Sequence, residues 1–479
     1  MTEHAVDTPC LDEPAYTPDP RRWRILGVSL VIGFMALLDV SIVNVAIPSM
    51  REGLHTSAGT IQWVVSGYAL AFGLTLVAGG RLGDAYGRRR LMLVGLALFI
   101  ASSAAVGFAP NAALVVLARL AQGASAGLLT PQNSGLIQQL FRGPERGRAF
   151  GIFGLTVSVS SAIGPVLGGL IIAVAGEENG WRWLFLVNVP IGLVAMVAVL
   201  ILVPRRAPST SATDNRIDVP GALLLGGTVL CLLYPVVRVE GGDRLPLLLL
   251  VGVPLFGWGF LAWERRTARR GHPPLLDLAL LRSLPGYLNG LAVGALYFTG
   301  FTGVLLVTSL YLQEGLGLSP LEAGLMLMPF AAGSAVSAPL AGRVVSDLGR
   351  RLTVGALATM IAGVVLVALL APGHDPLWPW LAPTLLVAGL GAGAVVSPNM
   401  TLTLAEVPPR MGGAAGGALQ TGQRIGASIG AAVLVTVYQV VVEDSSPDAA
   451  LRAALLTGAA LVSLALLMAI RAMRQARAT

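Results

Sequence analysis

The sequence predicts an all-α integral membrane protein with fourteen membrane spans, arranged as six, two and six. Three observations predict this class. The 479-residue chain is 55% hydrophobic and 12% charged, with a mean hydropathy of +0.76, which is far more apolar than a soluble protein. Its apolar residues form runs of about 20 residues, long enough to cross about 30 Å of hydrocarbon. A charged loop near residue 80 also recurs near residue 342.

The first 24 residues precede the first apolar run and differ from it in composition. They carry four prolines and five acidic residues, whereas a secretory signal begins with basic residues. We therefore expect residues 1–24 to be a disordered cytoplasmic tail.

The apolar runs that follow define the predicted domains. An amino-terminal six-helix bundle at 25–203 has its spans near 25–47, 59–79, 91–109, 112–138, 149–173 and 183–203. Residues 204–285 hold polar linkers and two extra spans, near 219–237 and 245–263. A carboxyl-terminal six-helix bundle at 286–471 has spans near 286–312, 321–342, 352–371, 380–402, 412–439 and 452–470, and 472–479 form a cytoplasmic tail.

The distribution of arginine predicts the orientation. All 32 basic residues are Arg, which is typical of a GC-rich bacterial genome. With both termini in the cytoplasm, 25 of them lie in cytoplasmic segments and five in outer segments, and positively charged loops stay cytoplasmic. The net charge of +7 therefore follows from membrane topology, and we expect no nucleic-acid partner.

The loop at 80–90, GRLGDAYGRRR, is a tight hydrophilic turn between two predicted spans. Its second copy is GRVVSDLGRR at 342–351, where five residues match the first copy at a constant offset of 262 residues. An offset of 262 residues is too long for six spans alone, and it fits six spans plus the two extra spans. A weaker echo joins 130–133, TPQN, to 397–400, SPNM. Such parallel halves predict a substrate site at their interface near mid-membrane.

Asp39 is the one acidic residue that we place deep within a predicted span. Hydrocarbon disfavours a carboxylate, so an acid there is usually functional and can exchange protons at ordinary pH. We expect Asp39 to carry the proton or bind substrate. The alternative is a snorkelling or structurally paired side chain.

Two arginines also fall inside predicted spans. Arg119 lies about 10 Å into the fourth span by helical rise and needs a partner; it either pairs structurally or modulates a nearby acid. Arg424 lies near the middle of the thirteenth span, close to Gln420 and Gln423. These three groups either line a polar pathway or, in the case of Arg424, hold a helix pair together.

We expect no metal site and no cofactor. The cysteines, Cys10 and Cys231, lie in the tail and in a span, so they cannot meet as a disulfide. The four histidines are scattered through tails and loops without metal-ligand spacing.

With these features in view, the chain from residue 22 to 471 resembles the major facilitator superfamily, and within it the fourteen-span drug:proton antiporters of the EmrB/QacA type. The family's cytoplasmic latch loop matches at Gly80, Arg81, Gly83, Asp84, Gly87, Arg88 and Arg89. The first-span and fourth-span motifs match at Asp39, Asn44, Pro48, Arg119, Gln122 and Gly123. The fifth-span antiporter motif matches at Gly154, Gly164, Pro165, Gly168 and Gly169, and the segment 181–193, WRWLFLVNVPIGL, is also typical.

This resemblance implies a major facilitator fold and proton-coupled export of a hydrophobic or amphipathic small molecule across the bacterial plasma membrane. It assigns proton coupling to Asp39 and Arg119. We expect a substrate pathway lined by Asn44, Gln122, Gln132, Asn133, Asn399, Gln420, Gln423 and Arg424. The second loop copy departs from the family, with Ser346 where an acid is frequent, which predicts a weaker latch. Because no deep acid appears in the ninth to twelfth spans, a neutral or monocationic substrate is expected.

Two other readings remain open at this point. The same superfamily fold also serves proton-coupled nutrient uptake. Outside the transporters, the alternative is a membrane-embedded enzyme or sensor, but the sequence offers no catalytic dyad or metal cluster to support it. The expected partners are the lipid bilayer, protons and a hydrophobic small molecule, and the expected state is a monomer.

Overall fold

The structure is a computed structural model that describes residues 18–176, 178–205, 218–240, 245–272, 274–276, 278–374 and 376–478, and every regular element in these ranges is helical. The first half consists of α1 (Arg22–Gly53), α2 (Ala58–Tyr86), α3 (Arg88–Gly107), α4 (Ala112–Leu140), α5 (Gly143–Ala175), α6 (Gly180–Leu186) and α7 (Asn188–Leu202). Two elements follow as an inserted pair, α8 (Val219–Glu240) and α9 (Gly252–Arg269), with the short helix η2 (Leu245–Val251) between them.

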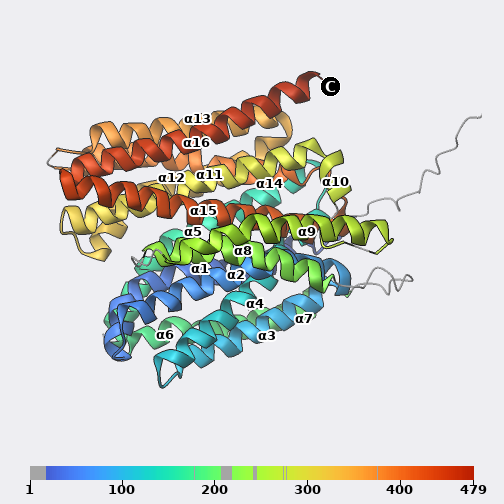
Figure 1. The fold of residues 1–479 in the computed structure, drawn as a ribbon, viewed down its shortest axis with the longest axis horizontal. Coiled ribbons are helices and arrows are strands. Elements are labelled where there is room, and N and C mark those ends of the chain that lie inside the picture. Colours follow the sequence, from blue (N-terminus) through green and yellow to red (C-terminus); the bar gives the residue numbers. More distant parts are fainter. Residues whose placement is uncertain are drawn as a thin grey trace, which may run out of the picture.

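The second half begins after the short helix α10 (Leu278–Ser283). It consists of α11 (Pro285–Leu310), η3 (Tyr311–Gly315), α12 (Pro320–Leu348), α13 (Arg350–Leu370), α14 (Trp378–Thr403), η4 (Pro409–Met411), α15 (Gly412–Asp444) and α16 (Pro447–Ala478). Figure 1 shows the two halves as two lobes, with α8 and α9 lying between them on the viewed face. The predicted all-α class is thus confirmed for the described residues.

The predicted count of fourteen spans is not supported. Twelve helical segments in the described residues are long and apolar enough to cross a membrane, and thirteen if the bent helix α5 is taken as one span. The difference falls on two helices. The two parts of α5, Gly143–Ser161 and Val166–Ala175, meet at 42°, and the apolar part of α8, Val219–Pro235, is too short. The break in α5 contains the predicted Gly164–Pro165 pair, where a proline removes a backbone donor.

Local chemistry explains where several helices begin. Ser57 caps α2 by accepting a hydrogen bond from the Thr60 amide, and Asn111 caps α4 in the same way. At the start of α12, Ser319 and Glu322 form a reciprocal capping box. These polar residues satisfy backbone N–H groups that would otherwise be left unpaired at the helix starts.

The repeated loop has the same backbone solution in both copies. Gly87 ends α2 with φ = 95°, and Gly349, its match at the offset of 262, ends α12 with φ = 55°. Only glycine adopts positive φ without strain, so both copies need glycine at this turn. The sequence repeat is thus also a structural repeat.

Contacts at helix ends show which ends lie together. Arg22, at the start of α1, forms an ion pair of 2.9 Å with Glu145 at the start of α5. At the other ends of the same helices, Gly53 lies against the backbone of Glu178, directly after α5. Helices α1 and α5 therefore run in parallel across the whole bundle.

The second half shares this end. Gly147, near the start of α5, packs against Gly342 near the end of α12. Gly286, at the start of α11, faces Arg350 of α13, and Asn289 hydrogen-bonds Gln475 of α16 at 3.5 Å. The start of α1 and the end of α16 thus lie at one end of the molecule, which we call the Arg-rich end because it holds the arginines of the repeated loops.

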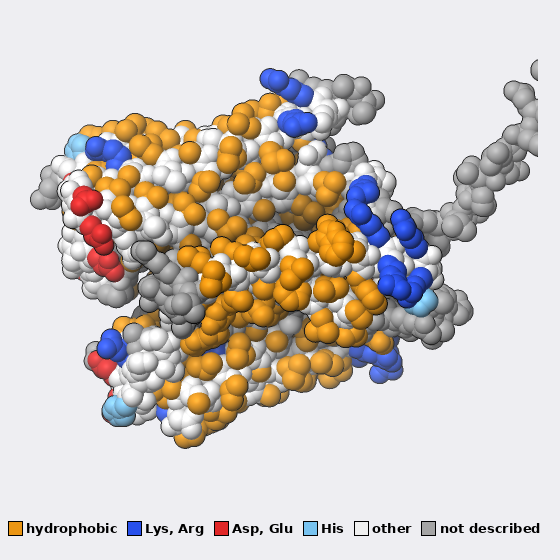
Figure 2. Space-filling view, viewed as in Figure 1, with side chains coloured by type: hydrophobic (Ala, Val, Ile, Leu, Met, Phe, Trp, Pro, Cys, Tyr) orange, Lys and Arg blue, Asp and Glu red, His pale blue; other side chains and the backbone are white. Residues whose placement is uncertain are grey.

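Contacts between the halves are concentrated toward the Arg-rich end. Helix α15 packs against α2 and α4, and α12 packs against α5. Among the described residues, the hydrogen bonds, ring contacts and close glycine approaches that join the halves extend no farther from this end than Ser158–Ser334 and Phe72–Arg424. Figure 2 shows the lobes diverging at the opposite end, where acidic side chains gather.

The inserted pair covers the seam between α2 and α15. Val229 and Leu233 of α8 pack with Leu70 of α2, and Ile425 of α15 joins the same apolar cluster. Trp63 of α2 stacks near Tyr234 of α8, with ring centroids 5.6 Å apart. Helix α8 therefore contacts both halves at once.

Candidate functional site

The structure brings Asp39 and Arg119 together as an ion pair in the interior of the first half. Asp39 lies just beyond the middle of α1, and Arg119 lies on the facing turn of α4. Each side chain is only about 1% exposed. A charge in such surroundings is stable only when it is paired and hydrogen-bonded, and each satisfies the other here.

Further polar groups complete the shell of this pair. Arg119 Nη1 donates to Asp39 Oδ2 and also to Gln122 Oε1 at 2.8 Å, while its Nε donates to the Val64 carbonyl at 3.0 Å. Asp39 Oδ1 accepts from Gln122 Nε2 at 2.9 Å and from Asn188 Nδ2 at 3.1 Å. The carboxylate therefore has three side-chain donors from two helices, Arg119 and Gln122 of α4 and Asn188 of α7.

Three members of this shell were not predicted as site residues. Asn188 stands in the segment 181–193 as a polar residue among apolar neighbours, which is the signal that points to it. Ser103 of α3 accepts from Gln122 Nε2 at 2.8 Å. The ring of Tyr68 lies under the Arg119 guanidinium at 4.1 Å, and the Tyr68 hydroxyl donates to the Ala36 carbonyl at 3.0 Å. Only the packing of α2 against α4 shows that Tyr68 belongs here.

This arrangement holds both charges of the pair in place. Loss of the Asp39 charge would leave a buried cation on an aromatic ring, and loss of the Arg119 charge would leave a buried, unpaired carboxylate. The packing of α1 against α4 at this level therefore depends on both charges.

The predicted latch loop forms a second polar network, at the Arg-rich end. Asp84 Oδ1 accepts from Arg88 Nη2 at 2.9 Å and from the Gly413 amide at 3.1 Å, and Oδ2 accepts from the Ala414 amide at 2.8 Å. Gly413 and Ala414 open α15, so Asp84 is an anion at a helix N-terminus of the other half. Arg88 also donates to the carbonyl of Pro409 at 3.0 Å.

Glycines of this loop allow the close approach. A Cβ atom at Gly80 would collide with the backbone of Gly413, and one at Gly83 would collide with Gln132. Arg89 donates to the Leu200 carbonyl at 2.7 Å within the first half. Arg81 is partly buried. The structure therefore places Asp84, Arg88, Gly80 and Gly83 in the contact between halves or directly beside it.

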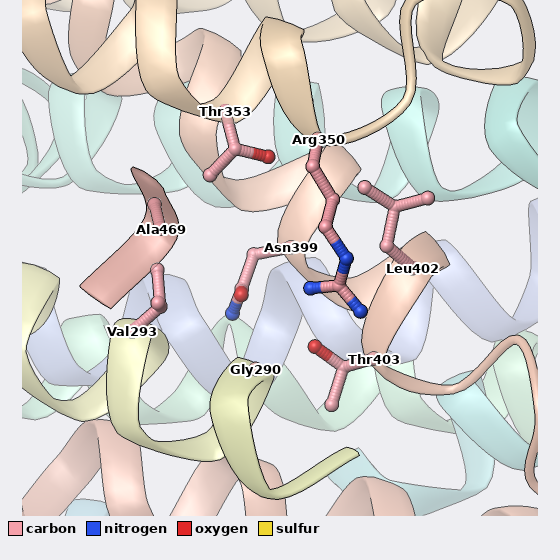
Figure 3. Close-up of a pocket in the computed structure, with 8 residues that line it drawn as sticks. All are labelled: Gly290, Val293, Arg350, Thr353, Asn399, Leu402, Thr403 and Ala469. Atoms are coloured by element: carbon pink, nitrogen blue, oxygen red, sulfur yellow. The ribbon is translucent and has the colours of Figure 1, made fainter. Parts of the chain in front are cut away.

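The second loop copy has no equivalent ion pair among the described residues. Asp347 is exposed, and the contact between α12 and α5 rests on Gly342 packing against Gly147 and Gly151. Arg350, the match of Arg88, instead points into a pocket within the second half, together with Asn399 (Figure 3). The pocket is lined by Gly290, Val293, Arg350, Thr353, Asn399, Leu402, Thr403 and Ala469.

The glycines of the fifth-span motif pack at helix contacts. Gly164 lies against Ser41 of α1, and Gly154 lies against Ala338 of α12. Gly168 is buried, whereas a Cβ atom at Gly169 would meet nothing within 4 Å. The side chain of Pro165 lies outside the described part of the chain. Close packing explains two of these glycines, and a gating role stays a prediction.

The residues of the predicted substrate pathway do not form one line. Gln132 and Asn133 pack inside the first half, against Gly79 and Ser29. Gln122 belongs to the Asp39 site, and the side chain of Asn44 lies outside the described residues.

The pathway residues of the second half divide in the same way. Asn399 and Gln423 both lie against Gly294 within that half. Gln420 reaches Ser134 of the first half at 3.5 Å, and the Arg424 guanidinium lies over the ring of Phe72 at 4.6 Å. Of the predicted pathway residues in the second half, Gln420 and Arg424 are thus the two that face the seam between the halves.

Comparison with known proteins agrees with this architecture. A family model described as Major Facilitator Superfamily matches residues 29–431. The human organic anion transporter MFSD10 has the same fold, with a TM-score of 0.69 at 18% identity over 94% of this chain and 100% of that one. The proton:xylose symporter XylE gives a TM-score of 0.65 at 16% identity, over 93% of this chain and 94% of its own.

Relatives of higher identity carry names that refer to antibiotics. A probable actinorhodin transporter of Streptomyces coelicolor is 38% identical over 441 residues, which is 90% of this chain and 75% of the relative. A tetracenomycin C resistance and export protein of Streptomyces glaucescens is 34% identical over 462 residues, covering 92% and 82%. The family match, the two-lobed helical fold and the repeated loop agree, and the chain belongs to the Major Facilitator Superfamily as a multi-pass membrane transporter.

Proposed function

We propose that this transporter exports a hydrophobic or amphipathic small molecule, of the antibiotic or toxic-metabolite kind, in exchange for inward-moving protons. The names of its relatives support drug export. The observation that carries proton coupling is the Asp39–Arg119 pair, a carboxylate buried at mid-helix with three side-chain donors. An intramembrane ionisable pair of this kind is usually part of an ion pathway.

The proposed cycle follows from the two polar networks. With Asp39 charged and paired, the Asp84 latch holds the Arg-rich ends of the halves together. A proton arriving at Asp39 from outside neutralises the carboxylate, frees Arg119 and favours the state in which the latch opens. Substrate then binds from the cytoplasm, and release of the proton inward restores the pair.

We further propose that the protein is a fourteen-span member of the drug:proton antiporters, placed in the bacterial plasma membrane with both termini in the cytoplasm, and that it works as a monomer. The shared end of α1 and α16 supports an even number of crossings. Helix α5 runs the length of α1, which supports counting it as a span, and α8 must then also cross to keep the number even.

Asp39→Asn tests the coupling. Inside-out vesicles are energised to an acidic interior, and a pH-sensitive dye reports proton loss as each drug of a broad amphipathic panel is added. We expect wild-type vesicles to lose protons with at least one compound and Asp39→Asn vesicles to lose none, while Asp39→Glu retains part of the response. The variant must elute as a folded monomer in detergent, because Arg119 loses its partner.

If Asp39→Asn vesicles still lose protons when drug is added, the assignment of proton coupling to Asp39 is wrong. If no compound releases protons from wild-type vesicles while intact cells accumulate one of them, the uptake alternative replaces export.

A further inference from the structure

The second intramembrane arginine, Arg424, differs from the first in having no acid beside it. Arg119 pairs with Asp39 and Arg88 pairs with Asp84. Within the described ranges, Arg424 has neither a hydrogen bond nor an ion pair, and its guanidinium lies over the face of the Phe72 ring at 4.6 Å, with Tyr68 next to that ring. A guanidinium that is largely removed from water without a carboxylate is costly and calls for an anionic partner.

Arg424 is also placed where a substrate can reach it. It lies on the face of α15 that packs on α2, about 18 Å from the start of the helix by helical rise, and so near mid-membrane. No hydrogen bond, ring contact or close glycine approach between the halves among the described residues lies farther from the Arg-rich end than this level. The side chain is partly exposed, unlike the fully buried Arg119. Arg424 thus lies at the outer limit of these contacts between the halves.

The surroundings of Arg424 are aromatic and hold one further donor. Phe72, over whose ring the guanidinium lies, and Tyr68, which supports Arg119, are both buried, with ring centroids 6.0 Å apart. Thr421, one helical turn before Arg424, has a buried hydroxyl with no hydrogen-bond partner among the described residues. Residues three apart share one face of a helix, so a donor hydroxyl accompanies the guanidinium.

We propose that Arg424 is the anion-recognition residue of the transporter, and that the substrate is a hydrophobic organic anion whose carboxylate or other acidic group binds this guanidinium. The proposal rests on the proposed function only in taking the seam between the halves as the substrate path. An anionic substrate differs from the neutral or monocationic substrate expected from the sequence. That expectation was based on the lack of acidic residues in the spans of the second half, and it did not take the unpaired charge of Arg424 into account. Arginine is the side chain best suited to bind a carboxylate through two parallel hydrogen bonds.

The test is a binding measurement on full-length protein in lipid nanodiscs without a proton gradient. Isothermal titration calorimetry compares three aromatic acids with their uncharged amides, built on naphthalene, anthracene and pyrene, and empty nanodiscs supply the background. We expect wild-type protein to bind at least one acid about tenfold or more tightly than its amide. Arg424→Gln should weaken binding of that acid by about tenfold or more and leave the amide within about twofold, while Arg424→Lys keeps part of the preference.

Arg266→Gln is the matched control, because it removes the same charge from an exposed position at the end of α9. Both variants must remain monodisperse by size-exclusion chromatography. Equal binding of acids and amides, no binding of any acid, or equal weakening of both by Arg424→Gln would each overturn the proposal. The binding measurement uses no proton gradient, so its result is independent of the vesicle test. If the wild-type protein prefers the acids while Asp39→Asn vesicles still lose protons when drug is added, the coupling role of Asp39 is refuted and the anion site is retained.

Discussion

At the scale of residues, the site depends on how fully Asp39 is satisfied. Its two oxygens accept hydrogen bonds from Arg119, Gln122 and Asn188, and the pair is closed from solvent. Removing one partner of such a buried pair typically costs about 3–5 kcal/mol, whereas removing one neutral donor costs less. The neutral donors are therefore the positions at which the hydrogen bonding of Asp39 can be weakened without destroying the pair.

Asn188→Ala should destabilise the protein by about 1–3 kcal/mol. The substitution removes a donor to a buried carboxylate oxygen and leaves that oxygen with one hydrogen bond fewer. The thermal-unfolding midpoint of the purified protein in detergent checks this. Ser103→Ala is the control, since Ser103 contacts Gln122 and not the carboxylate; an equal fall of the midpoint in the control, or an unchanged midpoint in Asn188→Ala, contradicts the prediction.

At the scale of elements, glycines decide how closely the halves meet at the Arg-rich end. The start of α15 and the end of α2 lie so close together that the backbones of Gly80 and Gly413 are in contact. This close approach allows the first amides of α15 to donate to Asp84. On the other side of the interface, α12 and α5 meet through Gly342 and Gly147 without an ion pair among the described residues. The latch thus consists of two close glycine contacts. The contact between Gly80 and Gly413 is reinforced by the charge of Asp84, and the contact between Gly342 and Gly147 is not.

Gly80→Ala should hold the Arg-rich end open. A methyl group at residue 80 would overlap the Gly413 backbone, which cannot yield as a flexible side chain would. Spin labels at Tyr86→Cys and Ala405→Cys, both exposed and one on each half, report the separation by double electron–electron resonance in a chain without its native cysteines. We expect longer distances in Gly80→Ala than in Gly355→Ala, where a Cβ atom meets nothing within 4 Å. Identical distance distributions would show that the contact is not limiting.

At the scale of the whole molecule, the inserted pair α8 and α9 determines how the halves are enclosed. Helix α8 contacts α2 and α15 and so covers one seam, on the side of the molecule where Arg424 meets Phe72. Both copies of the charged loop lie at the Arg-rich end, as parallel repeats require, so an even number of crossings separates them. Helices α8 and α9 therefore either both cross the bilayer or both do not.

A cysteine-accessibility experiment decides between these topologies. Ser211→Cys precedes α8 and Gly242→Cys follows it, in a chain lacking Cys10 and Cys231. We expect a membrane-impermeant thiol reagent to label residue 211 only in inside-out vesicles and residue 242 only in intact cells, because α8 separates them by one crossing. Labelling of both from one side would restrict the protein to fewer than fourteen spans.

The sequence by itself determined the class of the protein, its two halves and the residues that carry charge into the membrane. Apolar runs, arginine placement and the 262-residue repeat are local or periodic signals, so they can be read without a fold. The span count was less secure, because the bend in α5 and the short apolar part of α8 depend on helix geometry. Only the tertiary structure decided which charges meet. Pairing of Asp39 with Arg119, donation from Asn188 and the unpaired state of Arg424 depend on contacts between helices far apart in the chain, and no sequence spacing specifies such contacts.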